Sequence, residues 1–112
     1  MSTAWMYLVV AGLLEVGWAL GLKWSDGFDV RNKPVATILT VVALIASFAL
    51  LAQASKSLPI GTAYAVWTGI GAAGAAVGGM LLLGEPVAPL RVLFLTMLVV
   101  AIVGLKFSAG DA

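Results

Sequence analysis

Four long apolar runs restrict what this chain can fold into. They cover roughly residues 4–22, 34–54, 59–83 and 90–107, and each is at least 18 residues long. A helix needs about 20 residues to cross the ~30 Å hydrocarbon core of a bilayer, and strands are rarely that long. Helices also satisfy their own backbone hydrogen bonds in lipid. The sequence therefore predicts an all-α membrane protein with four transmembrane helices and short loops.

The composition excludes a soluble globular domain. Hydrophobic residues make up 62% of the 112 residues and charged residues only 10%, whereas a soluble domain carries about 25% charged residues. A small soluble domain buries only about 60–70% of its chain surface, so it could not hide this much apolar area. Four spans leave about 32 residues for loops and ends. We expect residues 1–112 to form a single transmembrane domain.

Missing residue types narrow the chemistry. The sequence has no Cys and no His, which excludes disulfides, thiolate or imidazole metal sites and His-dependent nucleophilic catalysis. The formal net charge of +1 provides no basic surface for nucleic acid. We expect no cofactor, no metal site, no nucleic-acid partner and no enzyme activity.

The distribution of basic residues between the two ends of the spans is weakly asymmetric. One side carries four Lys or Arg residues and the other only two: Lys23, Arg31, Lys33 and Arg91 against Lys56 and Lys106. A four-to-two split is a soft orientation signal. It leaves open both a single fixed orientation and insertion in both orientations.

Glu15 is the most informative residue, because it lies near the middle of the first run. A carboxylate there costs about 2.5–3.5 kcal/mol on insertion scales and usually marks an ion or substrate site facing a protein-lined cavity. A structural glutamate, hydrogen-bonded between helices, is the alternative. Desolvation favours the neutral form of a carboxyl group, and a second copy nearby favours it further. Such a group can exchange a proton for a cation.

Residues on the same helical stripe suit a cavity beside Glu15. Ala11 and Gly12 are small enough to leave room beside the carboxyl group, and Trp18 lies one turn further on with an indole N–H and a flat face. Plain packing is the alternative for a Trp inside a span.

Two further runs supply aromatic and hydroxyl groups. Tyr64 and Trp67 are three residues apart on one helix face, and aromatic faces attract cations by about 0.5–2 kcal/mol each. An aromatic packing cluster is the alternative. Ser47 is predicted to donate a hydrogen bond either to Glu15 or to its own helix.

A glycine motif in the third run is misleading. Gly69, Gly71 and Gly74 match the dinucleotide-binding pattern, but that pattern needs a preceding strand and a later acidic residue, and this one lies inside an apolar span. Instead, Gly74 and Gly78 predict close helix packing, and the glycine-rich stretch predicts a flexible point in the helix.

Two segments resemble the small multidrug resistance family: AGLLEVGWA at residues 11–19 and LPIGTAYAVWTGIG at residues 58–71. The resemblance extends to the GEP turn at residues 84–86 and the GLK ending at residues 104–106. It implies antiparallel, dual-topology dimers that exchange protons for cations at a shared pair of membrane glutamates, here Glu15. It also implies that Tyr64 and Trp67 line the cation site.

Within the family, Trp18 resembles the guanidinium-exporter branch. The resemblance implies a network that orients the two glutamates, formed by Gly12, Trp18, Ser47, Tyr64 and Trp67. The first loop, residues 26–33, is longer and more charged than is usual for the family. A heterodimer with a paired homologue and fixed orientations is therefore an alternative to the antiparallel homodimer.

The expected function is a proton-coupled antiporter in the bacterial plasma (inner) membrane. It would export guanidinium and small substituted guanidinium cations through a site shared by two Glu15 carboxylates, with lipid around it. The alternatives are a broad-specificity quaternary ammonium or multidrug cation exporter and a non-transporting membrane helper subunit.

Overall fold

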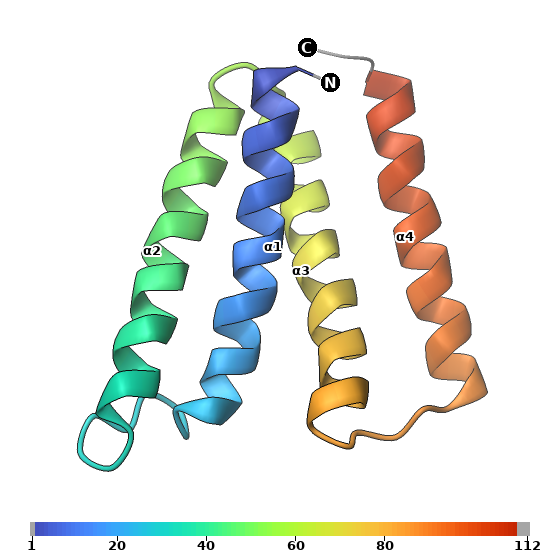
Figure 1. Ribbon diagram of the computed structural model, residues 1–112. Coiled ribbons are helices and arrows are strands. Elements are labelled where there is room, and N and C mark those ends of the chain that lie inside the picture. The colour runs from blue at the N-terminus through green and yellow to red at the C-terminus, as the bar shows by residue number, and fades with distance from the viewer. Residues whose placement is uncertain (1, 110–112) are drawn as a thin grey trace.

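The computed structural model describes residues 2–109, which form four α-helices (Figure 1). These are α1 (Thr3–Trp24), α2 (Pro34–Ser55), α3 (Ile60–Leu82) and α4 (Pro89–Ala109). All four are long and apolar enough to cross a membrane. The prediction of four transmembrane helices is confirmed, and each helix ends within two residues of an apolar run.

Local signals explain where the helices begin and end. The Ser2 hydroxyl accepts a hydrogen bond from the backbone N–H of Trp5 at 3.4 Å and caps α1. Pro34 occupies the first turn of α2, where its missing N–H has no helical partner to lose. After α3 the chain turns at Gly84, whose φ of +68° would strain any residue with a Cβ atom.

The connection between α1 and α2 is held by its own hydrogen bonds. Ser25 is fully buried, and its hydroxyl accepts from the backbone N–H of Phe28 at 3.1 Å. Asp29 accepts from the backbone N–H of Asn32 at 3.1 Å and from its side-chain amide at 3.0 Å. The backbone hydrogen bond, followed by the side-chain one, holds the pKa of Asp29 below its usual value.

Helix α1 lies between α2 and α3 (Figure 1), and glycines allow the close approach. A Cβ atom at Gly78 would lie 2.8 Å from the side chain of Leu20, and one at Gly74 would overlap Val16. On the other side of α1, a Cβ atom at Gly21 would overlap the Thr40 side chain of α2. The predicted packing at Gly74 and Gly78 is confirmed.

Helix α4 makes most of its contacts with α3 and stands to the side of the bundle (Figure 1). Lys106, near its end, lies 5.1 Å from the centre of the Trp5 ring. No α4 residue whose side chain is described is buried. The expected antiparallel dimer requires a second chain and stays a prediction.

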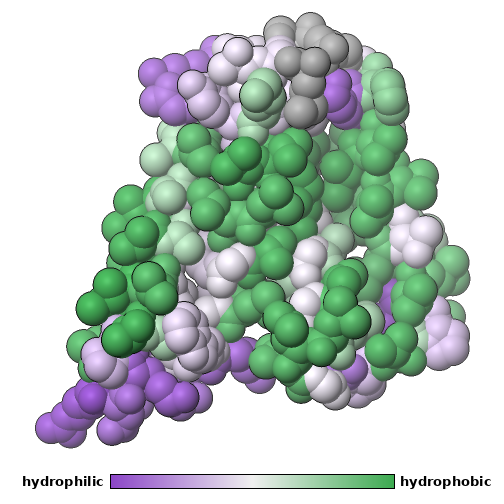
Figure 2. Space-filling view, in the orientation of Figure 1, coloured by the Kyte–Doolittle hydropathy of each residue, from purple (hydrophilic) through white to green (hydrophobic). Residues whose placement is uncertain are grey.

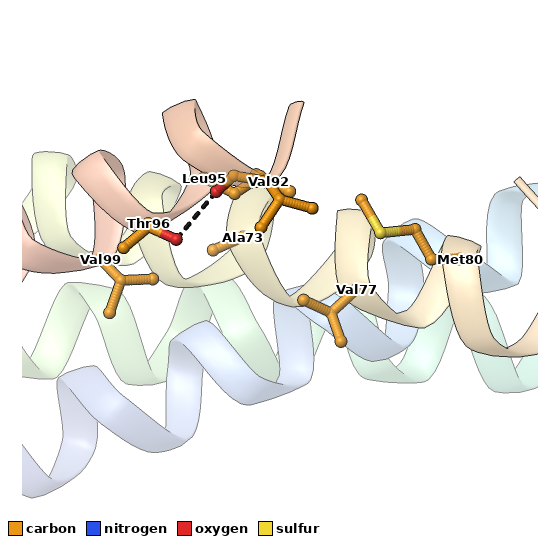
Figure 3. A pocket seen from close by; sticks show the side chains of 7 residues that line it. All are labelled: Ala73, Val77, Met80, Val92, Leu95, Thr96 and Val99. Carbon is orange, nitrogen blue, oxygen red and sulfur yellow. Dashed lines mark hydrogen bonds between the residues drawn. The ribbon is translucent and has the colours of Figure 1, made fainter. Parts of the chain in front are cut away.

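Two apolar cavities flank α4. One, of about 280 Å³, lies between α3 and α4 (Figure 3). Its one hydroxyl, from Thr96, donates to the backbone carbonyl of Val92 in the same helix at 2.8 Å. The other, of about 400 Å³, lies between α1, α3 and α4.

The surface of the molecule is divided into zones. Figure 2 shows a broad apolar band with hydrophilic side chains gathered towards the two ends. The α1–α2 and α3–α4 connections lie at the same end of the bundle (Figure 1). The four basic residues assigned to one side by the sequence therefore lie at the same end.

Candidate cation site

Glu15 lies in the middle of α1 and faces α3, where it packs against Gly71. A Cβ atom at Gly71 would lie 2.6 Å from Cγ of Glu15 and would overlap its carboxyl group. Only glycine therefore leaves space for the carboxyl at this point. One carboxyl oxygen, Oε1, is buried and accepts no hydrogen bond within residues 2–109.

The space beside Glu15 has a different source from the one the sequence suggests. Gly12 is buried, but it faces Ile70, whose Cβ atom would lie 2.8 Å from a Cβ atom at residue 12. The sequence indicated Gly71 only as part of the glycine motif and not as the residue that leaves room for Glu15. The spacing of Gly71, three residues from Gly74 and seven from Gly78, was the available signal, because residues so spaced share a helix face.

Ser47 links three helices and makes neither of its two predicted hydrogen bonds. Its fully buried hydroxyl donates to the backbone carbonyl of Ala11 in α1 at 2.7 Å. It accepts from the indole N–H of Trp67 in α3 at 2.9 Å. A helix carbonyl has a second lone pair for such a donor. Because Ala11 is one turn before Glu15, Ser47 and Trp67 hold the turn that carries the carboxyl.

Three aromatic rings gather between α2 and α3. The centre of the Trp67 ring lies 5.5 Å from that of Tyr64 and 5.0 Å from that of Phe48, with interplanar angles of 51° and 55°. Trp67 is only 4% exposed, whereas Tyr64 is 54% exposed. The structure therefore brings the two predicted aromatic residues together, with the Trp67 side chain buried and the Tyr64 side chain exposed.

Trp18 is half-buried and packs against the core shared by α1, α2 and α3. Its indole N–H is buried and donates no hydrogen bond within the described residues. Buried polar groups are nearly always paired. Glu15 and Trp18, one turn apart on α1, therefore both carry a buried polar atom that has no partner in the described part of the chain.

None of the six predicted site residues lines either of the cavities beside α4. Both cavities are almost wholly apolar. A carboxyl group, an indole N–H and a half-exposed tyrosine ring thus lie on two helices that are tied together through Ser47.

Comparison with known proteins decides the family. The family model described as Small Multidrug Resistance protein matches residues 3–98. The chain belongs to the small multidrug resistance family. The matched range contains all six predicted site positions: Gly12, Glu15, Trp18, Ser47, Tyr64 and Trp67.

Several curated proteins are similar to this chain over nearly its whole length. A protein of Escherichia coli (strain K12) is 58% identical over 105 residues, covering 94% of this chain and 97% of its own. A Salmonella typhimurium (strain LT2) protein is 56% identical over 106 residues, covering 95% and 98%. Both are named guanidinium exporters. Together with the four apolar helices, family membership makes this chain a multi-pass integral protein of the inner membrane.

Proposed function

We propose that this small multidrug resistance protein is a proton-coupled antiporter that exports guanidinium and small substituted guanidinium cations. Glu15 carries the proposal, because it is a mid-span carboxyl group with a buried oxygen that has no hydrogen-bond partner within residues 2–109. The names of relatives 56–58% identical to this chain support guanidinium as the cation.

The chemistry of guanidinium suits the Glu15 carboxyl group. Guanidinium is planar, keeps its charge at cellular pH and pairs with a carboxylate through two parallel hydrogen bonds. A proton binds the same oxygens, so the arrival of one cation releases the other. The faces of Trp18 and Tyr64 add cation–π attraction, while Ser47 and Trp67 position the α1 turn.

The complete site needs two chains. An inverted second copy would supply a second Glu15 near the bilayer midplane and create an inverted repeat from two polypeptides. The unburied α4 and the apolar cavities beside it support such a partner. We propose an antiparallel homodimer, with a paired homologue as the alternative partner.

The test uses the full chain expressed alone and reconstituted in liposomes containing a pH-sensitive dye. An outward guanidinium gradient should drive protons inward, and Glu15→Gln should abolish that movement. Asp26→Asn is the matched control, because it neutralises an exposed carboxylate in the α1–α2 connection and should leave coupling unchanged. Proton movement that persists in Glu15→Gln would refute the proposal.

The same liposomes separate the alternatives. Bulky aromatic quaternary ammonium ions that move protons as fast as guanidinium does would indicate a multidrug exporter. A folded chain that moves neither ion alone, but does so with a paired homologue, would indicate a heterodimer. No transport with any partner would indicate a helper subunit.

A further inference from the structure

A third cavity, of about 330 Å³, lies towards the end of the bundle that carries the α1–α2 and α3–α4 connections. Its floor is made of small apolar side chains of α1 and α3: Ala19, Ala72, Ala75 and Ala76. Its polar side chains are Lys23, Glu85 and Arg91. It is therefore the one cavity described here that combines charged groups with an apolar surface.

The charges in this cavity favour an anion. Arg91 donates from Nη2 to Oε1 of Glu85 at 3.1 Å, so the carboxylate is neutralised. Arg91 also donates from Nη1 to the backbone carbonyl of Pro86 at 3.1 Å. A guanidinium group has five N–H donors, which leaves donors for a ligand. The Lys23 side chain is exposed, and its ammonium group makes no hydrogen bond or ion pair within residues 2–109. The cavity thus has a net positive charge.

The position of the cavity fits the edge of a bilayer. Lys23 lies in the last turn of α1, and Arg91 lies in the first turn of α4. The two helices carry these cations at the same end, where basic side chains meet lipid headgroups. The alanine floor continues from there along the apolar part of α3. A free phosphate ion would use the cations but not the floor, whereas a phospholipid would use both.

We propose that this cavity binds an anionic phospholipid, with its phosphate at Lys23 and Arg91 and an acyl chain over the alanines of α3. Such a lipid would seat the two connections at the membrane surface. The proposal does not depend on transport, so it stands or fails apart from the function proposed above.

The test measures phosphatidylglycerol binding to the full detergent-solubilised chain by native mass spectrometry. Lys23→Gln should weaken binding roughly fivefold, the contribution of one basic residue near an anionic membrane surface. Lys23→Arg keeps the charge and should bind like the wild type. Lys56→Gln removes an exposed charge from the α2–α3 turn at the opposite end of the bundle and should have less than a twofold effect. A photoactivatable phosphatidylglycerol should cross-link to residues 72–76.

Three results would overturn the proposal. Equal weakening by Lys23→Gln and Lys56→Gln would mean that lipid responds only to overall charge. Displacement of the lipid by millimolar inorganic phosphate would mean that the site takes free phosphate. Cross-linking confined to other helices would place the lipid elsewhere.

Discussion

Ser47→Ala removes a buried hydroxyl that joins α1, α2 and α3. The substitution deletes the 2.7 Å hydrogen bond to the carbonyl of Ala11 and the acceptor that lies 2.9 Å from the Trp67 indole N–H. The Ala11 carbonyl retains its helical partner, since it lies inside α1. The Trp67 N–H has no such alternative, because the side chain is only 4% exposed. The change therefore strands one buried donor.

The loss of stability comes mainly from the Trp67 N–H, because Ser47→Ala leaves this donor unpaired while the Ala11 carbonyl keeps its helical partner. An unpaired buried donor costs about 1–3 kcal/mol, and a hydrogen bond between membrane helices contributes about 0.6 kcal/mol on average. We expect Ser47→Ala to lower the free energy of unfolding by about 1–3 kcal/mol. Trp67→Phe removes the indole donor. The double variant should therefore lose less stability than the two single variants added together, and the difference should be about 0.6–1.7 kcal/mol.

The assay is steric trapping of the full chain in bicelles at fixed protein concentration, since dimerisation also contributes to stability. Ser55→Ala is the control, because its hydroxyl donates only within α2, to the carbonyl of Ala52 at 2.8 Å. The control should change stability by less than about 0.5 kcal/mol. Equal effects of the two substitutions, or strict additivity of Ser47→Ala with Trp67→Phe, would refute the three-helix link.

Two further predictions concern packing and pH. Gly71→Ala should cut guanidinium-driven proton movement at least tenfold and lower the free energy of unfolding by about 1–3 kcal/mol, because the new methyl group would overlap the Glu15 carboxyl group. Gly61→Ala, which adds a methyl group in open space on the same helix, should preserve both transport and stability. Full transport by Gly71→Ala would contradict the placement of Glu15 against Gly71. At pH values above the ordinary pKa of Asp, the hydrogen bonds that lower the pKa of Asp29 stabilise the α1–α2 connection. This stabilisation is lost as the pH falls through the lowered pKa of Asp29. The Asn32 amide resonance should therefore stay constant from pH 8 to 5 and shift only below about pH 4; a shift near neutrality would contradict this.

The sequence alone determined the helices and the depth of the key carboxyl group. In lipid every backbone group must be satisfied within its own segment, so the length of an apolar run decides where a helix lies. Local backbone rules place Pro34 and the turn at Gly84, because proline lacks an N–H and glycine tolerates a positive φ. The mid-span position of Glu15 needed only counting along the first run.

Only the tertiary structure decided which groups meet. Helical periodicity assigns a residue to a face, but the axial register of two packed helices depends on how all their side chains interlock. Gly12 and Gly71 are both small residues on packed faces. The register of α1 against α3 nevertheless places Ile70 against Gly12 and the Glu15 carboxyl group against Gly71. In the same way, the packing of α2 against α1 directs Ser47 to a backbone carbonyl one turn before Glu15, a contact set by non-local geometry.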